Sequence, residues 1–481
     1  MSSPTPAPLA GYQPYRGLPP LAGLCSLDEA ARPGLLVEEC VRRLKRFHYA
    51  LQRLHQILTA RLTAEPVYEL KTGFAHHAYL CAEHVTALRT RIAEMREPPL
   101  GLEEVPHPAL EAYFDEIRNA PTTGELLAGV YEHAIGAITR AVEQYQADTN
   151  PLTDAPSRRV LKFARLELHE MGQWGRQCLA ALEVPSPREW FTGVLDRLLA
   201  CAGGLDGTVP APAEQEWPRR YSRTPYEYDP IPRRDERFTD PWNQGVNAES
   251  FLYSEAYPAR AKALMMLYKR LREIDVPEMM ARILTQTPGQ PWGYYRDMTR
   301  QMWDEARHAM MGEVGFVALG VDWTKAKITF NWSYRLNTEC SPLEAHGVLY
   351  FIEQGLMPRT GKRYEFEVAQ ESGLPLMATI QDFDWADEVL HSQIGREWYV
   401  PQFGSLKDAL DYGDRAWSKI LSNWATVKAK GLTDHANWWP DVYRMACAAE
   451  GVEPDPAVLA FCETYEGKRA DLKEVGEGMS G

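Results

Sequence analysis

The sequence lacks the features that would place the protein in a membrane or stabilise it with disulfides. No stretch approaches the ~20 consecutive apolar residues of a membrane span. Residues 1–24 are rich in Pro and Gly and contain no apolar segment of the signal-peptide type. The 8 cysteines are scattered and form no CxxC pair, which excludes a zinc ribbon and argues against a disulfide framework. We therefore expect a cytoplasmic protein with buried thiols and no membrane partner.

Positive charge is also in deficit. Lys and Arg number 52 against 66 Asp and Glu, which gives a formal net charge of −14. An acidic chain is poorly suited to wide contact with a phosphate backbone, so a nucleic-acid partner is not expected. The hydrophobic fraction of 45% and the charged fraction of 25% are those of an ordinary globular protein. A chain of 481 residues has room for about two to four domains.

Strand patterning is almost absent, because only residues 325–332 alternate between apolar and polar side chains. Helical periodicity recurs through the rest of the chain, so the sequence predicts an all-α fold. The expected helical segments are 34–95 (two helices, the second from about 67), 122–147, 156–182, 187–201, 248–273, 292–319, 342–355, 375–399, 405–429, 438–449 and 455–474.

The breaks between these segments divide the chain into five parts. Residues 1–30 are predicted to form an extended, Pro-rich arm, and residues 31–205 an N-terminal helical bundle without an evident metal site. Residues 206–247 are rich in proline and are predicted to be a linker. Residues 248–403 are predicted to form a four-helix bundle, followed by a C-terminal helical extension at 404–481.

Two of the helical segments carry the same motif, D-E-x-x-H, at positions 304–308 and 387–391. On a helix, the Glu and the His of this motif lie about 60° apart on one face, so both can reach one metal ion. The four candidate ligands are Glu305, His308, Glu388 and His391. The preceding residues, Asp304 and Asp387, lean toward the same face, and we expect each to accept a hydrogen bond from the His of the other motif.

A metal pair inside a helical bundle takes Glu-x-x-His from two helices and a single Glu from each of the other two. Glu255 precedes the first motif and Glu344 precedes the second, which completes the order. Glu249 or Glu273 stays open in place of Glu255, and Glu353 in place of Glu344. Buried carboxylates are costly unless cations balance them. Mixed carboxylate and imidazole ligands favour Fe or Mn over Ca or Mg.

Residues 248–403 resemble the ferritin-like di-iron carboxylate superfamily, and within it a poorly characterised group related to the tRNA-hydroxylating monooxygenases. The resemblance is carried by Asp-Glu-Ala-Arg-His at 304–308, Leu-Glu-Ala-His-Gly at 343–347 and Asp-Glu-x-x-His at 387–391. It implies a ferritin-like four-helix bundle that holds two Fe ions, or a Mn/Fe pair, with O₂ as co-substrate. The ligand set that it implies is Glu255, Glu305, His308, Glu344, Glu388 and His391. The spacing between the ligands, and the chain as a whole, are longer than in the compact members.

The expected function is that of a non-haem di-iron (or Mn/Fe) oxidase or oxygenase that oxidises a small organic substrate, with Glu305 and Glu388 as catalytic carboxylates. The alternatives are a ferroxidase or iron-handling protein, a metal-binding protein without turnover, and a tRNA-modifying hydroxylase. The length of 481 residues argues against simple storage, and the net charge of −14 argues against tRNA. A redox partner and a homodimer stay open.

Other residues of the motif helices have two interpretations. Gly312 and Gly395 each follow a motif His by four residues. Since glycine in a helix costs about 1 kcal/mol relative to alanine, it either opens a cavity beside the metals or allows close helix contact. Arg307 lies about 200° from Glu305 around the helix, so it is predicted to pair with an acid between helices.

Overall fold

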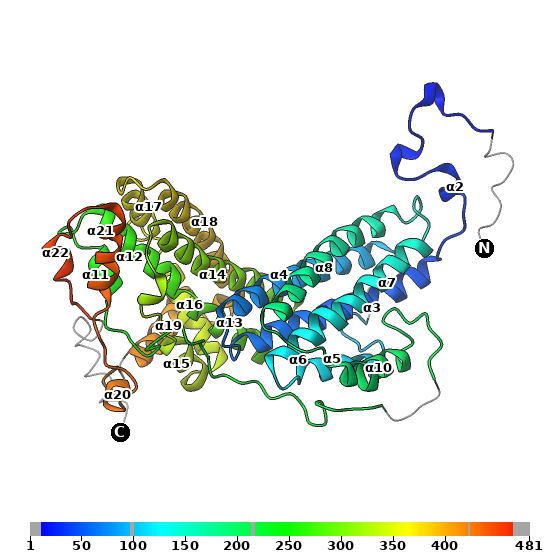
Figure 1. The fold of residues 1–481 in the computed structure, drawn as a ribbon. Helices are drawn as coiled ribbons and strands as arrows, with labels where there is room; N and C mark the ends of the chain where they lie inside the picture. Colours follow the sequence, from blue (N-terminus) through cyan, green and yellow to red (C-terminus); the bar gives the residue numbers. More distant parts are fainter. Residues whose placement is uncertain (1–10, 97–100, 213–216, 422–423, 465–481) are drawn as a thin grey trace. The chain divides into compact units, whose positions relative to one another are not determined.

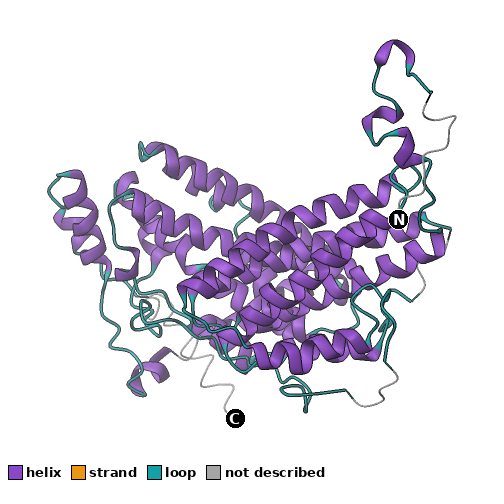
Figure 2. Ribbon diagram, turned by 45° about the vertical axis from the view of Figure 1, so that its right-hand side comes forward, coloured by secondary structure: helices purple, strands orange, loops and turns teal. Residues whose placement is uncertain are grey.

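The computed structural model describes residues 11–96, 101–212, 217–421 and 424–464 (Figure 1). All regular secondary structure in these ranges is helical, as Figure 2 shows, which confirms the all-α prediction. The alternating run at 325–332 does not form a strand: residues 326–330 have no regular structure, and a helix begins at Asn331. The start of the predicted arm and the end of the predicted C-terminal extension lie outside the described residues. None of the described helices has both the length and the apolar character that a bilayer span requires.

The chain divides into two compact units. The first unit comprises residues 1–57 and 80–227, and the second comprises residues 58–79 and 228–481. The division falls within α3 (Val37–Leu62) and α4 (Tyr68–Glu94), so the turn between these two helices belongs to the second unit. The prediction from sequence had placed this turn with the N-terminal helices.

The first unit consists of helices whose boundaries are set by local chemistry. Thr122 begins one of them by accepting at Oγ a hydrogen bond from the backbone N–H of Glu125, at 3.2 Å. From there, α6, η3 and α7 continue without a break, and α7 packs on α8. The helices of this unit, besides the parts of α3 and α4, are η1 (Tyr15–Gly17), η2 (Leu21–Gly23), α2 (Leu27–Ala30), α5 (Pro108–Arg118), α6 (Thr123–Leu127), η3 (Ala128–Ala134), α7 (Ile135–Asp148), α8 (Ala155–Ala181), α9 (Arg188–Trp190), η4 (Phe191–Leu195) and α10 (Asp196–Cys201).

The second unit contains the D-E-x-x-H motifs on its two longest helices, α14 and α18. These two pack against each other, and α12 packs on α14 while α16 and α17 pack on α18. The unit comprises α11 (Ala248–Leu252), α12 (Ala259–Arg272), α13 (Asp275–Gln286), α14 (Trp292–Ala318), η5 (Trp323–Lys325), α15 (Asn331–Glu339), α16 (Pro342–Gly355), α17 (Lys362–Glu371), α18 (Pro375–Trp398), η6 (Val400–Gln402), α19 (Leu406–Leu421), α20 (Trp424–Ala429), α21 (Trp439–Glu450) and α22 (Pro456–Leu459).

Glycines bring the motif helices close to their neighbours. A Cβ at Gly312 on α14 would lie 2.5 Å from the backbone nitrogen of Leu271 on α12. A Cβ at Gly395 on α18 would lie 2.2 Å from the Tyr350 ring on α16. Both glycines therefore serve close helix contact, which decides between the two interpretations drawn from the sequence.

Candidate metal centre

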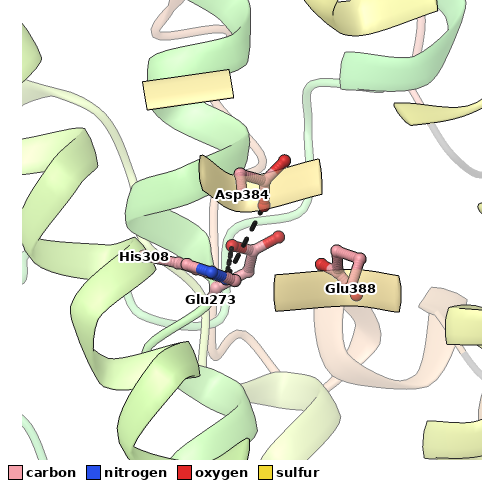
Figure 3. A group of neighbouring side chains, drawn as sticks. All are labelled: Glu273, His308, Asp384 and Glu388. Atoms are coloured by element: carbon pink, nitrogen blue, oxygen red, sulfur yellow. Dashed lines mark ion pairs between the residues drawn. The ribbon is translucent and has the colours of Figure 1, made fainter. Parts of the chain in front are cut away.

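Carboxylate and imidazole groups from α12, α14, α16 and α18 meet inside the second unit in two clusters. Within each cluster, one ligand atom from every residue lies within 4.8 Å of the others, as a single metal ion would require. The His308 group consists of Glu273, His308, Asp384 and Glu388 (Figure 3), and the His391 group consists of Glu305, Glu353, Glu388 and His391. Glu388 belongs to both groups, and every member except the half-buried Glu273 is buried.

In the His308 group, the imidazole nitrogen Nδ1 faces the acids. It lies 3.4 Å from Glu273 Oε2 and 3.6 Å from Asp384 Oδ1 (Figure 3). Glu273 follows the last residue of α12, while His308 comes from the middle of α14 and Asp384 from α18. Three helices thus direct ligand atoms toward one point.

The His391 group repeats this arrangement on the other motif helix. Its imidazole Nδ1 lies 3.2 Å from Glu305 Oε1, 3.5 Å from Glu388 Oε2 and 3.9 Å from Glu353 Oε1. The second oxygen of Glu305 lies 3.7 Å from His308 Nδ1, and the two imidazole centroids are 5.9 Å apart. Glu305 therefore faces both imidazoles, and Glu388 belongs to both groups.

The far nitrogen of each imidazole contacts the aspartate of the other motif. His308 Nε2 lies 3.2 Å from Asp387 Oδ2, and His391 Nε2 lies 3.4 Å from Asp304 Oδ2. This is the cross-pairing that the sequence predicts, and it orients Nδ1 toward the clusters. Arg307 donates hydrogen bonds to both aspartates, as expected of a residue between helices.

Several buried ligand atoms lack a hydrogen-bond partner. They are Oε2 of Glu273, Glu353 and Glu388 and Nδ1 of His308 and His391. A buried polar atom without a partner costs about 1–3 kcal/mol, more if it is charged. Metal ions would satisfy all five atoms at once, so the donor set fits a pair of divalent cations.

Burial and nearby acids act in opposite directions on the imidazoles. Burial lowers the pKa of His308, but the carboxylates of Asp387 and Glu273 outweigh it and raise that pKa to about 10. The pKa of His391 is raised in the same way, chiefly by Asp304. Without metal, protons on the imidazoles therefore balance part of the carboxylate charge.

In the His391 group, the pKa values of Glu353 and Glu388 are shifted in opposite directions. Burial, together with the charges of Glu388 and Glu305, raises the pKa of Glu353 well above its usual range. Burial also acts to raise the pKa of Glu388, but the ammonium of Lys362 and the imidazole of His391 hold it well below its usual range. Metal binding would displace such protons, because the ligands must be deprotonated.

Two buried cations border the His308 group, and neither was identified from the sequence. Lys362 Nζ lies 2.9 Å from Asp384 Oδ1 and 2.8 Å from Glu388 Oε1. Arg270 pairs with Asp384 and, at 2.7 Å, with Glu273. Asp384 had a detectable signal, since it lies one helical turn before Glu388 on the same face. Lys362 and Arg270 had none, because only tertiary packing brings them to the cluster.

The structure places the two preferred single glutamates outside the clusters. Glu255 is exposed in the turn between α11 and α12 rather than on a helix. Glu344 caps α16, where its Oε2 accepts a hydrogen bond from the backbone N–H of Ser341 at 2.7 Å. Of the alternatives left open, Glu273 and Glu353 lie in the clusters.

A cavity of about 890 Å³ adjoins the clusters. Glu273, Glu305, Glu353 and Glu388 line it together with many apolar side chains. Glu249, the remaining alternative from the sequence, also lines it and pairs with Arg272 at 2.9 Å. A molecule in this space would lie beside the candidate ligands.

No protein-family model, curated protein or solved structure matches the chain. The function is therefore argued from the geometry of the site.

Proposed function

We propose that this protein is a ferritin-like di-metal oxidase or oxygenase that binds two Fe ions, or a Mn/Fe pair, and uses O₂ to oxidise a small organic substrate. The observation that carries the proposal is the pair of buried clusters that share Glu388, each with an imidazole aimed at carboxylates. Such ions, when bound, would supply the activation of O₂.

The order of ligands along the chain supports the ferritin-like arrangement. Known bundle sites take a single Glu from two helices and Glu-x-x-His from the other two. Here Glu273 directly follows the last residue of α12, α14 carries Glu305 with His308, and α16 carries Glu353. The fourth helix, α18, carries the second Glu-x-x-His.

The protein's own residues would hold and orient the ligands. Asp387 and Asp304 fix the imidazole rings so that Nδ1 points inward. Glu305 reaches toward both imidazoles, and together with Glu388 it would hold the metal ions. A redox partner would supply the electrons that O₂ reduction needs beyond those of the substrate.

The adjoining cavity favours an enzyme over an iron-storage protein. Ligand pockets typically enclose ~300–1,000 Å³ and are mostly apolar with a few polar groups. The cavity of about 890 Å³ fits this description, and four of its lining residues belong to the clusters. Storage would require a path for ions rather than an apolar chamber.

Elemental analysis of the purified protein after reconstitution with Fe(II) tests the proposal. We expect two metal ions per chain in the wild type, loss of metal in Glu305→Ala and His391→Ala, and O₂ consumption without a mineral core. Glu344→Ala and Glu255→Ala are matched controls that should keep both ions. Unchanged metal content in Glu305→Ala and His391→Ala would refute the site.

A further inference from the structure

The cavity beside the clusters has walls that indicate what it binds. Its apolar lining comes from several helices and includes two tryptophans. Val276 and Met279 come from α13, Leu336 from α15, and Leu349 and Ile352 from α16. At ~30 Å³ per molecule, the cavity could hold about 30 waters, and those beside its apolar walls would find few hydrogen bonds. An apolar occupant would instead gain about 25 cal/mol for each Å² removed from water.

The charges of the lining are strongly one-sided. Seven carboxylates line the cavity against two cations, Lys269 and Arg272. Both cations are already paired: Lys269 with Glu365, and Arg272 with Glu249 at 2.9 Å. The Arg272 guanidinium also lies 4.6 Å from the centre of the Trp332 ring, which is part of the lining. Neither cation is therefore poised for an anionic head group.

Bound metal ions would not change this preference. Two divalent cations would offset most of the charge of the seven carboxylates, so the filled cavity would be close to neutral. An anionic ligand would still have to separate Lys269 or Arg272 from its acid, which leaves a buried charge unpaired. A carboxylate or phosphate group is thus disfavoured with or without metal.

We propose that this cavity binds a predominantly apolar small molecule that carries no anionic group, and that this class contains the substrate. The assignment of substrate rests on the proposed function, whereas the binding itself rests only on the cavity. The size of the space, about 890 Å³, admits a molecule of drug-like dimensions.

Fluorescence titration of the metal-free, full-length protein with the neutral probe N-phenyl-1-naphthylamine tests the inference. We expect one saturable site per chain, from which 1-decanol displaces the probe at least 10-fold more effectively than decanoate at pH 7. Equal displacement by decanoate would overturn the exclusion of an anionic group. Absence of saturable binding would overturn the cavity as a site.

Cavity-filling variants locate the binding. Leu349→Trp should weaken probe binding at least 10-fold, because Leu349 lines the cavity. Ile352→Trp is a second variant on the same helix, in case the first does not fold, as judged by circular dichroism. Val389→Trp is the matched control, because Val389 lies on α18 with 40% of its surface exposed. Unweakened binding in folded Leu349→Trp or Ile352→Trp would overturn the inference.

Metal content measured on the same samples separates the two proposals. Metal binding without probe binding would defeat this inference and leave the proposed metal centre standing. Probe binding without metal would defeat the proposed function and leave an apolar binding site.

Discussion

The two halves of the candidate centre differ in how their carboxylates are balanced. In the His308 group, the permanent cation Arg270 contacts Glu273 and Asp384, and Lys362 contacts Asp384 and Glu388. In the His391 group, the shared Glu388 is the one carboxylate that a Lys or Arg side chain contacts among the described residues. Glu353 of that group instead accepts a hydrogen bond from the neutral amide of Gln301, at 3.2 Å.

Two groups with similar ligands can therefore differ in their affinity for metal ions. A metal ion in the His391 group meets two carboxylates, Glu305 and Glu353, that no Lys or Arg side chain contacts among the described residues, so only ligand protons compete with it there. A metal ion in the His308 group is repelled by a guanidinium that stays protonated and by the Lys362 ammonium. We therefore expect the His391 group to fill first and the His308 group to bind more weakly.

Removal of the shared carboxylate should weaken metal binding in both groups. Glu388→Gln takes a ligand from both groups while keeping the side-chain volume, so we expect both binding steps to weaken by at least about 100-fold. Isothermal titration with Mn(II) measures this loss. Glu344→Gln is the control and should keep two steps, because Glu344 only caps α16. Two intact steps in Glu388→Gln would contradict the shared site.

Substitutions of the two aspartates that contact the imidazoles should each affect a different metal-binding step. Asp387→Asn weakens the hydrogen bond to His308 Nε2, and we expect a loss of ~10–100-fold in the weaker step alone. Asp304→Asn should weaken the tighter step alone, through His391. The same titration measures both. Equal effects of the two substitutions on both steps would show that the groups do not act separately.

Loss of a competing cation should reduce the difference in metal affinity between the two groups. Lys362→Met removes the ammonium from Asp384 and Glu388, so we expect the weaker step to tighten by about 10-fold. The metal-free variant should also unfold at a lower temperature, because two buried carboxylates lose a partner. Lys262→Met is the control, since Lys262 contacts the Tyr364 hydroxyl instead. A weaker second step in Lys362→Met would contradict the competition.

His346, a buried imidazole outside the clusters, has a pKa that is shifted in the direction opposite to that of His308. Burial lowers the pKa of His346 on α16 to about 4, whereas the pKa of His308 is raised. The unfolded chain, with a His pKa of ~6.5, takes up the proton first, so the free energy of unfolding should fall as pH drops from 6.5 toward 4. We expect His346 to contribute about 1 kcal/mol of this fall between pH 7 and 5.5. Urea unfolding of His346→Phe should show a free energy of unfolding that falls by this much less between pH 7 and 5.5. A pH dependence equal to that of the wild type would contradict the lowered pKa of His346.

Local rules allowed part of this centre to be predicted from sequence. Glu305 with His308 and Glu388 with His391 obey helix spacing, which packing does not alter. The single glutamates needed more than spacing. The helix expected at 248–273 is broken after Leu252, which leaves Glu255 in a turn.

Competing local chemistry accounts for the other misplaced glutamate. Ser341 and Glu344 form a capping box, a role that takes the carboxylate away from the interior. The cations could not be predicted at all, because Lys362 begins a helix that periodicity did not reveal. Its contact with Asp384 depends on how α17 packs on α18.

Anomalous X-ray diffraction at the iron absorption edge, from crystals of the reconstituted protein, tests the central claim most directly. The account predicts two anomalous peaks, one beside Nδ1 of His391 and a weaker one beside Nδ1 of His308, with Glu388 contacting both. Density for Lys362 or Arg270 at those positions without any anomalous peak would contradict it, as would iron bound at Glu255 or Glu344 instead.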